Sequence, residues 1–115
     1  MTCESTAYEL LEWCKGYHHV PRMEEIFSGT TREIPSHPGT LYLLSAQIVD
    51  YARTHQDSRG IDHMLGYVGA MPAEFCHRIY KDLLTIAPIR RRLMNDYSFN
   101  TWFERSGRSW DRYGL

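Results

Sequence analysis

The spacing of apolar residues predicts helices along most of the chain. In the segment 6–18, Thr6 and Glu9 form a capping box, and apolar residues recur three and four positions apart on one face. A short helix is expected from Pro21 to Phe27, ended by Gly29, because proline suits the first turn of a helix and glycine follows the last. The residues 29–39, which contain two prolines and two glycines without periodicity, are predicted to form a loop.

The middle of the chain predicts the most buried helices. The segment 40–55 is apolar on most sides at its start, which is typical of a helix at the centre of a bundle. A second apolar stripe runs over 61–71. There Gly66 and Gly69 each cost a helix about 1 kcal/mol relative to alanine, which indicates close contact with a neighbouring helix or a weak helix. The segment 72–86, begun by Pro72, has one apolar and one polar half and is predicted to be the most regular helix.

The C-terminal third predicts two shorter helices and a tail. Pro88 interrupts the preceding helix, and Ile89 and Leu93 then face inward while the three arginines between them face mostly outward. Ser98 is expected to cap a final helix that carries three aromatic residues at core spacing. Trp110 lies beyond Gly107 in a segment without a helical stripe, so it either folds back over the bundle or faces a partner. The tail 106–115 is expected to be extended.

No segment alternates with a period of two for long enough to predict a strand. The expected fold is therefore a single all-α domain, 1–115, a compact bundle of five to six helices, some of them short. The segment 40–55 should lie at its centre and 72–86 along one side. The predicted core consists of Leu10, Leu11, Cys14, Leu41, Leu44, Ile48, Leu65, Val68, Phe75, Ile79, Leu83, Leu93, Phe99 and Phe103.

Composition narrows the class of protein. The 115 residues are 43% hydrophobic and 23% charged, which is long and apolar enough for a domain with its own core. The longest aliphatic run, LYLL at 41–44, is too short to span a membrane, and the first residues lack the basic region of a signal peptide. Three cysteines at unpatterned spacings do not indicate a disulfide scaffold, so a cytoplasmic protein is expected.

The sequence contains no recognisable catalytic or metal-binding motif. Cys14 and His18 lie four positions apart, a spacing that can present two zinc ligands, but no C-x-x-C or H-x-x-x-H motif completes a site. Glu74 and His77 match the E-x-x-H pair of di-iron bundles, yet the pair occurs once and on the polar face. Cys76 and His77 diverge by about 100° on a helix and cannot act as a dyad. We expect no metal, no other cofactor and no enzymatic activity.

The charges are unevenly distributed and favour a binding function. The net charge is −1, but residues 1–57 hold four basic and eight acidic side chains, against nine and six in 58–115. Arginine, tryptophan and tyrosine dominate the binding energy of protein interfaces, and they concentrate near the C-terminus. We therefore expect a non-catalytic protein–protein interaction domain, a small adaptor, subunit or inhibitor of a larger protein or complex, including phage or defence-related inhibitors. The predicted partner-binding residues are Arg90, Arg91, Arg92, Arg105, Arg108, Trp110, Arg112 and Tyr113.

The alternative is a nucleic-acid-binding protein. The segment 61–84 has the order helix, turn, helix, as in a helix-turn-helix motif whose second helix enters the major groove. Glu74 and Asp82 lie on the same exposed face and would be repelled by phosphates, which weakens this interpretation. The residues predicted to bind nucleic acid are His77, Arg78, Lys81, Arg90, Arg91 and Arg92.

Overall fold

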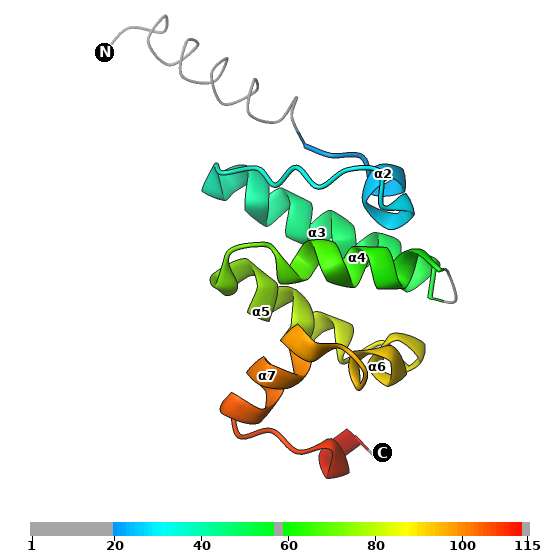
Figure 1. Ribbon diagram of the computed structural model, residues 1–115, viewed down its shortest axis with the longest axis vertical. Coiled ribbons are helices and arrows are strands. Elements are labelled where there is room, and N and C mark those ends of the chain that lie inside the picture. The colour runs from blue at the N-terminus through cyan, green and yellow to red at the C-terminus, as the bar shows by residue number, and fades with distance from the viewer. Residues whose placement is uncertain (1–19, 57–58, 114–115) are drawn as a thin grey trace, which may run out of the picture.

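Every regular element that the structure describes is a helix (Figure 1). The computed structural model describes residues 20–56 and 59–113, and the predicted all-α class is confirmed. The elements are α2 (Met23–Ser28), α3 (Pro38–Thr54), α4 (Gly60–Gly69), α5 (Ala73–Leu83), α6 (Ala87–Leu93), α7 (Tyr97–Arg105) and the 3-10 helix η1 (Trp110–Tyr113). The predicted helix 6–18 lies outside the described residues. Of the helices described, none has both the length and the apolar character needed to cross a membrane.

Among α2 to α5, each helix packs mainly on the helix two positions away in the chain order. α2 packs on α4, and α3 packs on α5. α6 and α7 lie beyond α5, and η1 forms the C-terminal end of the molecule (Figure 1). The start of α3 is less enclosed than its apolar residues suggested, because Tyr42 and Leu43 are 44% and 39% exposed. The helix buries one face rather than its whole circumference.

One continuous hydrophobic core runs from α2 to α7. The predicted core residues from Leu41 onward are all at most 5% exposed, so helical periodicity identified the buried face of each helix correctly. Leu10, Leu11 and Cys14 lie outside the described residues. Met64 and Tyr80 lie on the apolar faces of their helices but were not in the predicted core; Met64 is fully buried and Tyr80 is 1% exposed.

Three helix starts differ from the expectation, and α3 begins at Pro38 instead of 40. α2 begins at Met23, two residues after Pro21, although Gly29 ends it as predicted with a φ of 75° that favours glycine. α7 begins at Tyr97, and the cap is Asp96 rather than Ser98. The Asp96 carboxylate accepts a hydrogen bond of 2.8 Å from the Phe99 amide. Asp96 takes this role because its own backbone is extended, as an N-cap requires, whereas Ser98 already lies within the first turn.

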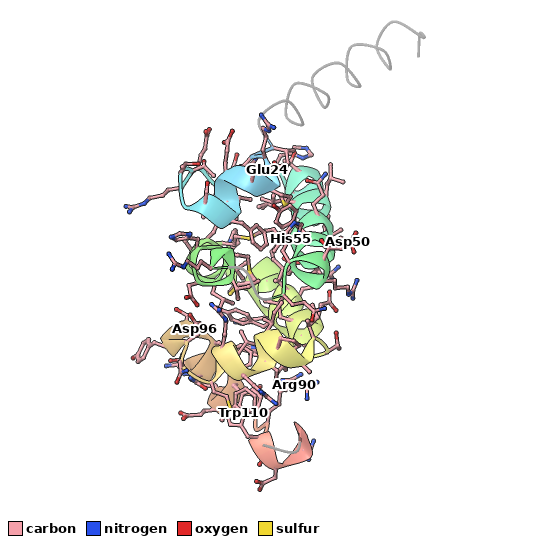
Figure 2. The ribbon with its side chains drawn as sticks, turned by 90° about the vertical axis from the view of Figure 1, so that its right-hand side faces the viewer. Glu24, Asp50, His55, Arg90, Asp96 and Trp110 are labelled. Carbon is pink, nitrogen blue, oxygen red and sulfur yellow. The ribbon has the colours of Figure 1, made fainter. Side chains whose placement is uncertain are left out.

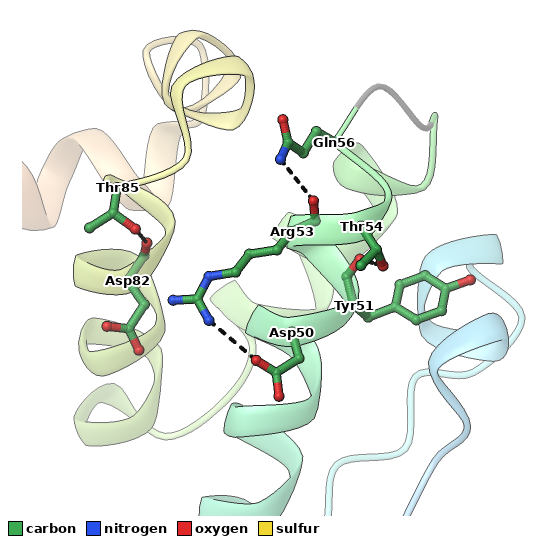
Figure 3. A network of polar contacts seen from close by, with 7 residues as sticks. All are labelled: Asp50, Tyr51, Arg53, Thr54, Gln56, Asp82 and Thr85. Carbon is green, nitrogen blue, oxygen red and sulfur yellow. Dashed lines mark hydrogen bonds and ion pairs between the residues drawn. The ribbon is translucent and has the colours of Figure 1, made fainter.

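The C-terminal end of α3 is held by local polar contacts (Figure 3). Arg53 pairs with Asp50 at 3.2 Å, and the Gln56 amide donates to the Arg53 carbonyl at 2.8 Å. These side chains lie at the surface, where such pairs contribute less than about 1 kcal/mol. Arg53 is therefore a suitable control position for the arginine substitutions considered below.

Candidate protein-binding surface on α7

An aromatic cluster joins α5 to the C-terminal helices. Phe99 is fully buried, and the Tyr80 ring meets it edge-on with centroids 5.1 Å apart. Phe103 packs beside Phe99 at 5.4 Å, and Trp102 lies against Tyr80 at 5.5 Å. The three aromatic residues predicted at core spacing on this helix therefore all belong to the cluster, with Trp102 only half-buried at its edge.

Trp110 belongs to this cluster as well. Its ring stacks on Phe103 with centroids 4.4 Å apart and planes inclined by 18°. In Figure 2 its side chain points from η1 toward the helices. The chain reverses at Gly107, whose φ of 74° is readily adopted by glycine, and continues as η1 instead of an extended tail. Of the two interpretations left open by the sequence, the structure thus shows the one in which Trp110 folds back onto the bundle.

The remaining tail residues are distributed around the same end. The Arg108 guanidinium lies over the Trp102 ring, 4.7 Å from its centroid, where a cation is attracted by the aromatic face. Arg112 is exposed on η1. The side chain of Tyr113 lies outside the described part of the structure. The expectation of an extended tail is therefore wrong for residues 110–113, which form the 3-10 helix η1.

The arginine triplet of α6 is divided among three environments. The Arg90 Nε donates to the Leu84 carbonyl at 2.7 Å, and Arg92 pairs with Asp62 of α4 at 3.1 Å. Arg91 is exposed. The prediction that all three point mostly outward is thus correct for Arg91 and wrong for the other two, which are half-buried.

Arg90 compensates for a proline at the junction of α5 and α6. Pro88 has no N–H to donate to the carbonyl four residues earlier, which belongs to Leu84, and α5 ends at Leu83 instead of 86. The Arg90 side chain supplies the missing donor. We expect Arg90→Ala to lower the free energy of unfolding by about 1–2 kcal/mol, since a part-buried acceptor is left unpaired. Arg91→Ala should change it by less than about 0.5 kcal/mol.

Urea denaturation of the two variants tests this division of the triplet. Equal losses for Arg90→Ala and Arg91→Ala would contradict the role of Arg90 as a donor to Leu84. Arg53→Ala on α3 controls for the general effect of removing a surface arginine.

The residues proposed to contact nucleic acid on α5 face different neighbours. His77 is half-buried and stacks on Trp102 of α7, with centroids 5.5 Å apart. The Arg78 guanidinium lies over the Tyr42 ring of α3 at 4.9 Å, and Lys81 is exposed. α4 and α5 are joined by a short turn, as the motif requires. However, α7 and α3 flank the helix that would enter a groove, so these side chains do not form one open face.

A shallow groove of about 350 Å³ lies between α5 and α7. It is lined by His77, Ser98, Thr101, Trp102, Arg105 and Ser106, and of these described residues none is acidic. The Thr101 hydroxyl donates to the Tyr97 carbonyl at 3.0 Å, so it offers only lone pairs to the groove. Arg105 is exposed and offers N–H donors. The groove can therefore hold a group with hydrogen-bond acceptors for Arg105 and a donor for Thr101.

Tyr97 stands at the edge of this surface and is 85% exposed. The adjoining corner between α6 and α7 is held by the Asn100 amide, which donates to the Met94 carbonyl at 2.8 Å. Met94 itself is 40% exposed. Tyr97 is not among the residues predicted from the sequence to bind a partner. A helical wheel would have found it, since Tyr97 lies about 160° away from Phe99 on α7.

The buried titratable groups near the groove are suited to packing. Burial raises the pKa of the Cys76 thiol, and it also raises the pKa of Tyr80, with the neighbouring Cys76 adding to the shift. A thiol with a raised pKa is a poor nucleophile at neutral pH. Within residues 20–56 and 59–113, no three histidine, cysteine or acidic side chains are grouped as metal ligands. The Cys14–His18 pair lies outside these residues.

Comparisons with protein-family models, with curated proteins and with solved structures find no match for this chain.

Proposed function

We propose that this chain is a non-catalytic protein-binding domain whose docking surface is the outer face of α7 with the adjoining groove. The observation that carries the proposal is Tyr97, a large side chain that is 85% exposed on a well-packed helix. The same helix presents Arg105 beside the half-buried Trp102. Tyrosine, arginine and tryptophan are the residue types that contribute most to binding energy at protein interfaces.

The α7 surface retains only part of the binding set predicted from the sequence. Arg105 and Arg108 lie beside or over Trp102 and belong to the proposed surface. Arg91 and Arg112 are exposed and remain candidates for partner contacts. Arg90, Arg92 and Trp110 are left out because each contacts another part of the fold. A domain of this kind would act as an adaptor, subunit or inhibitor of a larger protein or complex, including phage or defence-related ones.

The experiment is affinity capture from native lysate with wild-type protein and Tyr97→Ala. The partner retained by the wild type should bind Tyr97→Ala about 30-fold more weakly, the equivalent of about 2 kcal/mol for a hot-spot residue. The melting temperature should stay the same, because the ring is exposed. Quantitative mass spectrometry of the retained proteins, followed by titration of the purified partner, measures both effects.

Matched controls come from the opposite end of the bundle. Leu43→Ala removes an exposed apolar side chain from α3, and Arg53→Ala removes a surface arginine; both should retain the partner. Retention by Tyr97→Ala equal to that of wild type would contradict the proposal. Recovery of nuclease-sensitive nucleic acid that depends on Lys81 would favour the alternative function.

A further inference from the structure

A second hollow, of about 380 Å³, lies between α4 and the loop that follows α2. This volume is within the range of sites that hold small molecules. Its walls include Arg32 and Ile34 of the loop and His63, Gly66 and Tyr67 of α4. None of these residues belongs to the α7 surface, so the hollow is a separate feature of the molecule.

Two hydrogen bonds from α4 fix the walls of this hollow. The His63 Nδ1 lies 3.1 Å from the Phe27 carbonyl, and the Tyr67 hydroxyl donates to the Glu33 carbonyl. Tyr67 is 6% exposed, and burial, together with the nearby Glu33 charge, raises the pKa of Tyr67 to about 12. Its hydroxyl therefore remains a donor well above neutral pH. One bond thus ties α4 to α2 and the other ties α4 to the loop that follows α2, so the two walls of the hollow are held together by the fold.

Gly66 keeps the hollow open. A glycine inside a helix is destabilising relative to alanine, and Gly66 and Gly69 of α4 differ in what surrounds them. A Cβ at Gly69 would lie 3.4 Å from the Ser98 hydroxyl of α7, which is an ordinary van der Waals contact. A Cβ at Gly66 would meet no atom within 4 Å, and its φ is not positive. Nothing in the described fold requires glycine at Gly66, and a side chain there would occupy the hollow.

The polar groups of the walls define the ligand. A carbonyl only accepts, so the His63 Nδ1 donates to the Phe27 carbonyl, and a ring that carries this single hydrogen offers an Nε2 lone pair. Arg32 forms no ion pair among the described residues, whereas the acid at the rim, Asp62, is paired with Arg92. Ile34 and the Tyr67 ring supply apolar surface. A complementary molecule combines an anionic group, a ring-sized apolar body and a hydrogen-bond donor.

We propose that this hollow binds a small aromatic carboxylic acid that bears a hydroxyl or N–H group. The carboxylate pairs with Arg32, the ring lies over Gly66 between Ile34 and Tyr67, and the donor meets the His63 Nε2. Arginine suits the first contact because its planar fork can donate two parallel hydrogen bonds to a carboxylate.

Amide NMR of the full chain, titrated with 4-hydroxyphenylacetate, tests the site. We expect saturable shifts at the amides of His63, Gly66 and Tyr67. Two analogues that each lack one feature, 4-methylphenol without the carboxylate and phenylacetate without the hydroxyl, should bind at least fivefold more weakly. No saturable shift at millimolar concentrations, or shifts confined to other residues, would overturn the proposal.

Two variants separate binding from folding. Gly66→Ala should raise the melting temperature by about 2–6 °C. It should also weaken the binding of 4-hydroxyphenylacetate at least tenfold. Because the melting temperature rises while ligand binding weakens, unfolding cannot be the cause of the weaker binding. Arg32→Ala should bind 4-hydroxyphenylacetate no more tightly than 4-methylphenol. Arg53→Ala should still bind 4-hydroxyphenylacetate more tightly than 4-methylphenol. Wild-type affinity in Gly66→Ala, or an intact preference in Arg32→Ala, would show that the acid does not occupy this hollow.

Discussion

Replacing Phe99 by alanine is expected to lower the free energy of unfolding by about 3–5 kcal/mol. The Phe99 ring has no exposed surface and is the centre of the aromatic cluster, in contact with Tyr80, Trp102, Phe103 and Trp110. Truncation would leave a cavity bounded by four rings, which are too large and too constrained to close it. Urea denaturation followed by circular dichroism measures the change.

Neighbours of Phe99 provide a graded control for this prediction. Tyr97→Ala, two positions earlier on α7, should change the free energy of unfolding by less than about 0.5 kcal/mol, because its side chain is exposed. Trp110→Ala should lower the free energy of unfolding by an amount between those of Tyr97→Ala and Phe99→Ala, because its half-buried ring covers Phe103 from the outside. A loss at Tyr97 as large as that at Phe99 would contradict the orientation of α7. No loss at Trp110 would instead support the tail interpretation in which this residue faces a partner.

Ile48→Ala and Ile79→Ala should each lower the free energy of unfolding by about 2–5 kcal/mol. Both side chains have no exposed surface, and they belong to α3 and α5, which pack against each other. Removing buried methyl groups loses the favourable free energy of transferring them from water to the interior. It also leaves a cavity in a densely packed core. Thermal and urea denaturation of the two variants check the prediction independently on each helix.

The controls for these variants lie on the opposite faces of the same helices. Asp50→Ala on α3 and Lys81→Ala on α5 should each change the free energy of unfolding by less than about 0.5 kcal/mol, as exposed residues do. Losses below about 0.5 kcal/mol at both isoleucines would mean that the two faces are not packed together.

The arginines of the C-terminal half show why a cluster in sequence does not establish a binding site. Three consecutive residues on a helix point in directions about 100° apart. Arg90 therefore reaches back to Leu84, Arg92 reaches α4, and Arg91 faces outward. The positive excess of this half is partly consumed by contacts within the fold. The proposed binding surface follows from exposure on α7 rather than from the number of charges.

The sequence by itself determined the all-α class, the approximate extent of most described helices and their buried faces. These properties depend on periodicity and on local stop signals such as Pro88 and Gly29, which act within a few residues. The predictions of helix ends were less accurate because these same local signals do not fix a boundary to within two residues. Whether Asp96 or Ser98 caps α7 depends on a single backbone conformation, which the apolar pattern does not encode.

Only the tertiary structure decided which polar and aromatic side chains are available for function. A helical wheel places Tyr97 on the outer side of α7, where it is exposed, but it does not show that the chain reverses at Gly107 and that Trp110 packs back on Phe103. Likewise, Gly66 and Gly69 are equivalent in the sequence, but Gly69 meets α7 and Gly66 borders an open hollow. The physical reason is common to both pairs. Local periodicity states which side of a helix is apolar, whereas the partner of each side chain is set by atoms brought close from distant parts of the chain.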